Sequence, residues 1–137
     1  MAKPILTWFV QDDDNSYNVY KSYSEPGSIQ PGDTLEKNIR IYNGYGGQIV
    51  DNSYNTKLVV AFKDYESNFL LNLFEVKVND GEFEKLEIDI DRGSVNLGTI
   101  YKNEYVDIKI KIGPIPENIN NGLKSVIFYL ENDKFSL

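Results

Sequence analysis

Strict alternation of apolar and polar residues is the feature that most limits how this chain can fold. In the segment EYVDIKIKIG, residues 104–113, Val and Ile occupy every second position, and Asp and Lys lie between them. A period of two places the apolar side chains on one face of a β-strand and the charged ones on the other. The segment TLEKNIRIYN, residues 34–43, repeats the pattern. Both segments are therefore predicted to be strands with one buried face.

The segment TKLVVAFKD, residues 56–64, is apolar on both faces, as expected of a central strand. The segment KSVIFYLEN, residues 124–132, is also apolar on both faces and is predicted to be the last full strand. Turn signals rich in Pro, Gly and Asn recur at intervals of about eight to twelve residues, which is typical of an all-β sandwich. We predict an all-β protein with a single antiparallel β-sandwich domain over residues 1–137. An immunoglobulin-like strand order is the first interpretation, and a jelly roll is the alternative.

The chain contains neither Cys nor His. It therefore lacks disulfides, thiol nucleophiles, imidazole ligands for zinc and imidazole acid–base groups. Its formal net charge of −7 would repel a phosphate backbone and an anionic membrane, so neither nucleic acid nor membrane is an expected partner. The N-terminal segment has no signal-peptide pattern. We expect a protein made in the cytoplasm, with no cofactor and no enzymatic activity.

The segment NGYGGQIVDN, residues 43–52, holds three glycines between two predicted strands. A dinucleotide fingerprint would need a glycine at position 49, which is Ile49, and a helix after it. We therefore interpret the segment as a corner in which Gly46 and Gly47 adopt positive φ, where the chain leaves one sheet for the other.

Two acidic segments allow a chemical and a structural interpretation. Asp12, Asp13 and Asp14 could begin a calcium loop, but the remaining EF-hand spacing is absent, and a solvated hairpin tip is the simpler interpretation. Glu87, Asp89 and Asp91 could pair as glycosidase carboxylates, although alternate residues on any wet strand face meet that distance.

Tyrosines offer a stronger functional lead. Five residues in and near the Gly-rich segment could form a flat aromatic and amide platform for a glycan: Tyr42, Asn43, Tyr45, Asn52 and Tyr54. The alternative is that several of them pack inward and the rest are scattered.

Short motifs in the first half of the chain form a recognisable series: Leu6, Trp8 and Asp12; Gly27, Ile29 and Gly32; Ile41, Asn43, Gly46 and Gly47; Lys63 and Asp64. This series resembles small accessory virion proteins of tailed bacteriophages. The resemblance implies a structural virion protein that folds in the host cytoplasm. The expected role is capsid decoration or a head accessory function, and a tail or baseplate component is an alternative. The family pattern carries no catalytic residues, and a carbohydrate-binding sandwich remains a further alternative.

Such a protein would dock on a repeated lattice of capsid or tail subunits and be oligomeric in the assembly. The two apolar ends of the chain are the predicted contact elements: Ile5, Leu6, Trp8, Phe9, Phe135 and Leu137. The alternative for Trp8 is a place in the core of the domain itself.

Overall fold

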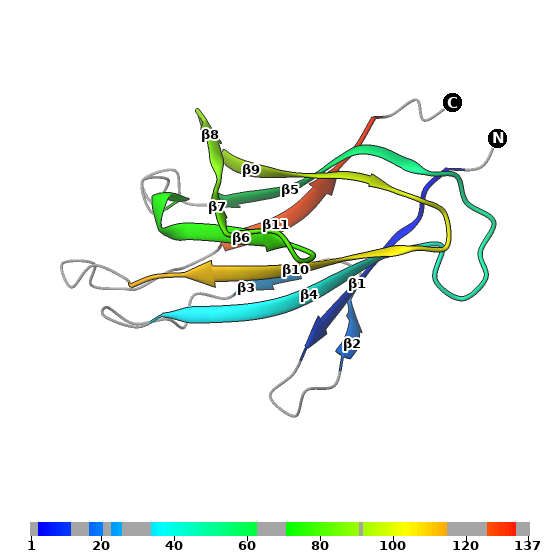
Figure 1. Ribbon diagram of the computed structural model, residues 1–137, viewed down its shortest axis with the longest axis horizontal. Coiled ribbons are helices and arrows are strands. Elements are labelled where there is room, and N and C mark those ends of the chain that lie inside the picture. The colour runs from blue at the N-terminus through cyan, green and yellow to red at the C-terminus, as the bar shows by residue number, and fades with distance from the viewer. Residues whose placement is uncertain are drawn as a thin grey trace.

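The computed structural model describes residues 3–11, 17–20, 23–25, 34–62, 71–90, 92–114 and 126–133. These residues form eleven β-strands (Figure 1). The strands are β1 (Leu6–Gln11), β2 (Tyr17–Tyr20), β3 (Tyr23–Glu25), β4 (Leu35–Asn43), β5 (Ser53–Phe62), β6 (Phe74–Val78), β7 (Glu84–Lys85), β8 (Glu87–Asp89), β9 (Arg92–Ile100), β10 (Tyr105–Ile112) and β11 (Val126–Glu131).

The strands form two antiparallel sheets. Sheet A has the order β2-β1-β4-β10-β6-β7, and sheet B has the order β3-β11-β5-β9-β8. The segment of β7 and β8 changes sheets at Leu86, because β7 pairs with β6 in sheet A and β8 pairs with β9 in sheet B. The predicted antiparallel β-sandwich is therefore confirmed.

The strand order distinguishes the two sandwich topologies that the sequence left open. Eight of the strands can be numbered 1 to 8 along the chain: β3, β4, β5, β6, β7, β9, β10 and β11. Sheet B then contains the order 1-8-3-6 and sheet A the order 2-7-4-5. This is the strand order of a jelly roll. The observed topology is therefore that of the jelly roll and not the immunoglobulin-like order that was the first interpretation.

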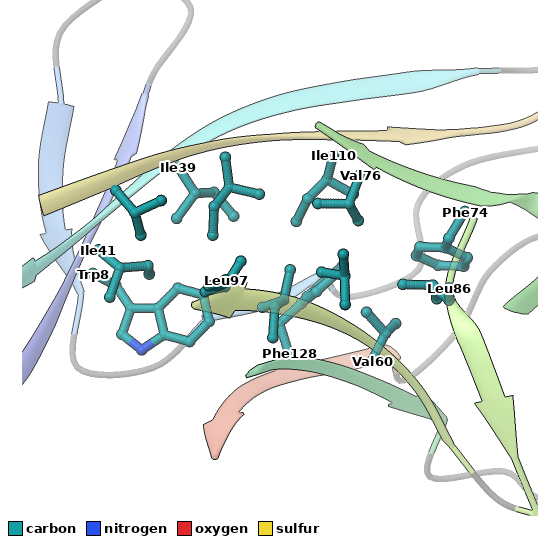
Figure 2. Packing of buried hydrophobic residues seen from close by; sticks show 14 of the residues in the cluster. Trp8, Ile39, Ile41, Val60, Phe74, Val76, Leu86, Leu97, Ile110 and Phe128 are labelled. Carbon is teal, nitrogen blue, oxygen red and sulfur yellow. The ribbon is translucent and has the colours of Figure 1, made fainter. Parts of the chain in front are cut away.

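The core lies between the sheets and follows the alternation of the strands. Val106, Ile108, Ile110 and Ile112 of β10 are all buried, as their spacing predicts. Figure 2 shows Trp8 toward one end of this cluster and Phe74 and Leu86 toward the other. The central position predicted for residues 56–64 is confirmed for β5, which lies between β11 and β9.

The Gly-rich segment is a corner between the sheets. It leaves β4 of sheet A at Asn43 and enters β5 of sheet B at Ser53. Gly46 and Gly47 have φ of 81° and 78°, a region that glycine adopts without steric cost. Figure 1 shows this connection at the same end of the sandwich as the connection from β9 to β10. The predicted role of Gly46 and Gly47 is confirmed.

Candidate functional site

Aromatic side chains gather on the outer face of sheet A, where alternation would lead one to expect polar residues. The inward positions of β1, β4 and β10 belong to the core, so the alternate positions Phe9, Tyr42 and Tyr105 point away from it. Tyr45, from the corner after β4, joins them. We call these four aromatic residues, Phe9, Tyr42, Tyr45 and Tyr105, together with Arg40, which lies over the ring of Tyr105, the aromatic face.

The rings of the aromatic face contact one another across three strands. The centroid of Tyr45 lies 4.8 Å from that of Phe9 and 5.7 Å from that of Tyr42, both edge-to-face. Tyr42 and Tyr105 are cross-strand partners whose rings stack at 5.9 Å. Tyr45 and Tyr105 each remain 48% exposed. The rings therefore support one another while leaving aromatic surface open to solvent.

Arg40 lies at the edge of the aromatic face, where it pairs with Asp107 and packs on Tyr105. Its Nε lies 2.7 Å from Oδ1 of Asp107, and its Nη2 lies 3.2 Å from Oδ2 of the same carboxylate. The guanidinium carbon sits 3.9 Å from the centroid of Tyr105, which is cation–π geometry. Phe9, Arg40, Tyr42 and Tyr45 together line a hollow of about 260 Å³.

A second hollow, of about 280 Å³, lies on the same face of the sheet and is polar. We call it the lysine hollow; it is lined by Asn38, Lys77, Asn79, Asp107, Ile108 and Lys109. Arg40 lines the aromatic hollow and Asp107 lines the lysine hollow, so the Arg40–Asp107 ion pair forms their shared border.

A third hollow, of about 400 Å³, is lined by residues of sheet B and the segment after β11. Its lining contains no aromatic residue and consists of Asn55, Lys57, Asn96, Glu131, Asn132 and Asp133. Nearby, Arg92 pairs with Glu131, and that hydrogen bond raises the pKa of Arg92 above its usual value. Both arginines of the chain therefore already hold a carboxylate.

The structure brings together only part of the predicted glycan platform. Tyr42 and Tyr45 contact each other, but their rings are inclined at 77°, so they do not form the flat platform that was predicted. Tyr54 belongs to β5 of the other sheet, where its hydroxyl accepts a hydrogen bond from Asn52. The predicted participation of Asn43 is wrong, because its side chain is fully buried. Its amide is used inside the protein, donating to the backbone carbonyls of Asp51 and Ile100.

Those predicted docking residues that the structure describes also lie in different environments and do not form one surface. Trp8 is 3% exposed and belongs to the core, so its predicted place at an interface is wrong. The cause is the alternation of side chains along β1. Trp8 and Val10 point into the core, and Phe9, which lies between them, points outward. Leu6 is partly buried against the core, and Ile5 is exposed. Phe135 and Leu137 lie outside the described residues.

The structure describes only part of the two candidate acidic sites. Glu87 and Asp89 are exposed on edge strand β8, whereas Asp91 and Asp12–Asp14 lie outside the described residues. Within the described ranges, no three acidic residues are grouped so that they could hold a metal ion. No helix in those ranges is long and apolar enough to cross a membrane.

Sequence reasoning missed Arg40 and Tyr105 and assigned Phe9 to a different surface. A signal for all three was present. Each is a large side chain at a polar-phase position of a strand whose other phase is apolar. What the sequence lacks is the register, which places Phe9 opposite Arg40 and Tyr105 opposite Tyr42.

Comparisons with known proteins do not identify a family for this chain. No protein-family model matches it, and no curated protein matches it. Among solved structures it is similar to one described by the words "AvmM Catalyzes Macrocyclization in Alchivemycin A Biosynthesis". The identity is 13%, the match covers 96% of this chain and 86% of that chain, and the TM-score is 0.42. A likeness of this degree carries no argument about function.

Proposed function

We propose that this chain is a non-catalytic binding domain that holds a carbohydrate on the aromatic face of sheet A. The observation that carries the proposal is the contact of Phe9, Tyr42, Tyr45 and Tyr105 on an outer sheet face beside a hollow. Tyr45 and Tyr105 are exposed, and Phe9 and Tyr42 beside them are partly buried. Grouped aromatic residues on an outer face are typical of interaction sites, and this supports the proposal.

The chemistry of this surface suits a sugar ring. The C–H groups on one face of a pyranose can pack on the electron-rich face of an aromatic ring, while its hydroxyls stay hydrated or reach polar neighbours. Tyr45 would supply that ring, because the guanidinium of Arg40 already lies over the ring of Tyr105. The hollow is smaller than the about 300–1,000 Å³ typical of sites that enclose a drug-sized ligand. It therefore fits a single sugar unit on an open surface.

Replacement of Tyr45 by Ala tests the proposal without removing a strand residue. Tyr45 lies in the corner after β4, outside the sheet ladders, so its loss should leave folding intact. On an array of neutral and acidic glycans, we expect Tyr45→Ala to weaken retention by about tenfold or more.

Tyr101→Ala is the matched control, because Tyr101 is a 56% exposed connection tyrosine that does not belong to the aromatic face. It should bind as the wild type does. If the wild type retains no glycan, or if both variants lose retention equally, carbohydrate binding through this face is refuted.

An accessory role on a phage virion is the second proposal, and it is compatible with the first. Among the described residues of the motif series, Trp8 and Ile41 are core residues, whereas Asn43, Gly46 and Gly47 belong to the corner. The observation that favours docking lies elsewhere, at edge strand β8, where Ile88 is 45% exposed and Ile90, just beyond it, is 81% exposed. Jelly rolls occur in both viral capsid and lectin domains, so the fold does not choose between the proposals.

Immunogold labelling of particles from the source organism tests the virion proposal. We expect an antibody against this chain to label phage heads in negative-stain electron micrographs. Label at tail tips would favour a baseplate component instead. Particles without any label would contradict the virion proposal and leave a free carbohydrate-binding domain.

A further inference from the structure

We propose that the ligand of sheet A is an acidic oligosaccharide that packs one sugar on the aromatic face and places a carboxylate at Lys77 and Lys109. This inference rests on the proposed carbohydrate binding and specifies the class of sugar. It is carried by the position of the lysine hollow and by an uncompensated pair of lysines within it.

The two hollows lie in line along the strands of sheet A. Tyr42 and Tyr105 form one cross-strand row, Arg40 and Asp107 the next, and Asn38 and Lys109 the one after that. Successive rows on one face are two residues apart, so the first and third rows are separated by about 13 Å. That span exceeds one sugar ring, and an oligosaccharide crossing the Arg40–Asp107 border could occupy both hollows.

Among the charged residues on this face, Lys77 and Lys109 are the ones with no carboxylate among their described cross-strand partners. Asp107 also lines the lysine hollow, but it pairs with Arg40. Lys111 faces Glu36 on one neighbouring strand and Glu75 on the other. Arg40 faces Asp107, with which it pairs.

Lys109 instead faces Asn38 on one side and Lys77 on the other. Like charges directly opposite each other destabilise a sheet, and a bound anion would relieve that repulsion. Neither Lys77 nor Lys109 forms an ion pair with any residue that the structure describes.

The surroundings of the lysines favour a sugar acid over a simple anion. Two amide side chains, Asn38 and Asn79, share the lining with the lysines. Asn38 Nδ2 donates to Gln11 and Asn79 Oδ1 accepts from the backbone N–H of Asp107, so the Asn38 oxygen and the Asn79 N–H groups are the ones that can exchange hydrogen bonds with hydroxyl groups. The adjoining aromatic hollow offers apolar contact that an inorganic anion cannot use. The chain as a whole carries a net charge of −7, so attraction of an anion must come from such a local site.

The test uses tetragalacturonate and the hyaluronate tetrasaccharide, each beside its carboxyl-reduced counterpart, in which every carboxylate has become a primary alcohol. We expect the wild type to bind at least one acidic form about tenfold more tightly than its reduced form, measured by calorimetry. The double variant Lys77→Gln, Lys109→Gln should lose this preference while still binding the reduced form. Lys111→Gln removes a positive charge from the same strand face. It should keep the preference because Lys111 lies outside the lysine hollow, opposite Glu36 and Glu75 and with its Nζ 5.6 Å from the ring centroid of Phe83.

The remaining outcomes separate this inference from the proposed function. Equal affinity for acidic and reduced forms would overturn the acidic specificity and leave carbohydrate binding intact. Equal loss of the preference in Lys111→Gln would overturn the assignment to the lysine hollow. A tetraglutamate peptide that binds as tightly as the acidic sugars would show a site for acidic peptides and overturn the sugar. Failure of all four oligosaccharides to bind would overturn the acidic specificity, and failure of every glycan on the array would overturn carbohydrate binding itself.

Discussion

Replacement of Trp8 by Ala is expected to lower the free energy of unfolding by about 3–5 kcal/mol, the range for truncating a large buried aromatic residue. Trp8 is 3% exposed, is the cross-strand partner of Ile41, and belongs to the same buried cluster as Leu97 (Figure 2). The loss combines the hydrophobic contribution of the indole with the cavity it would leave. Urea denaturation followed by far-UV circular dichroism measures it without depending on the fluorescence of the removed residue.

Ile5→Ala is the control for Trp8, because Ile5 lies in the same N-terminal segment and is 42% exposed. It should change the free energy of unfolding by about 0.5 kcal/mol or less. Where Trp8→Ala does not fold, Trp8→Phe gives a smaller loss that can be measured. Unchanged stability of Trp8→Ala would contradict its place in the core and restore it as a residue for docking.

Asn43→Leu is expected to lower the free energy of unfolding by about 2–4 kcal/mol, although it exchanges side chains of similar size. The Asn43 Nδ2 donates to the carbonyl oxygens of Asp51 and Ile100 at 2.8 and 3.0 Å, and its Oδ1 accepts from the backbone N–H of Ile5 at 3.2 Å. A leucine would leave these three backbone groups without that partner. Unsatisfied buried polar groups are costly, so the corner should be held less firmly against the N-terminal segment, to which the backbone N–H of Gly44 still donates at the carbonyl of Ile5.

Asn52→Ala separates this effect from the general loss of an amide. Asn52 accepts a hydrogen bond from the backbone N–H of Lys102 and donates to the Tyr54 hydroxyl, both at exposed sites. Water can replace these partners, so the loss should stay within about 1 kcal/mol. Equal losses for Asn43→Leu and Asn52→Ala in the same denaturation experiment would contradict the structural role given to Asn43.

Much of the fold could be predicted because alternation is a local property. In residues 104–113, every second residue is apolar, and that pattern alone identified the buried side chains of β10. The jelly-roll order could not be read in the same way, since it depends on pairings between distant segments, such as β4 with β10. Local turn signals are compatible with either sandwich topology.

The candidate site was predictable only where its residues are close in sequence. Tyr42 and Tyr45 lie three positions apart, and they do meet. Phe9 and Tyr105 reach them through cross-strand register, which a single sequence does not reveal. Asn43 was misassigned because an asparagine in a Gly-rich segment looks like a surface residue. Here its amide donates to Asp51 within the corner and to Ile100 at the end of β9.

NMR mapping shows whether the aromatic face of sheet A binds carbohydrate. The isotope-labelled wild-type protein is titrated with the oligosaccharide that gives the highest signal on the glycan array. We predict the largest chemical-shift changes at the ring resonances of Phe9, Tyr42, Tyr45 and Tyr105. If the ring resonances stay unchanged and the side-chain amides of Asn55, Asn96 and Asn132 shift instead, the carbohydrate binds in the hollow beside sheet B and not on the aromatic face.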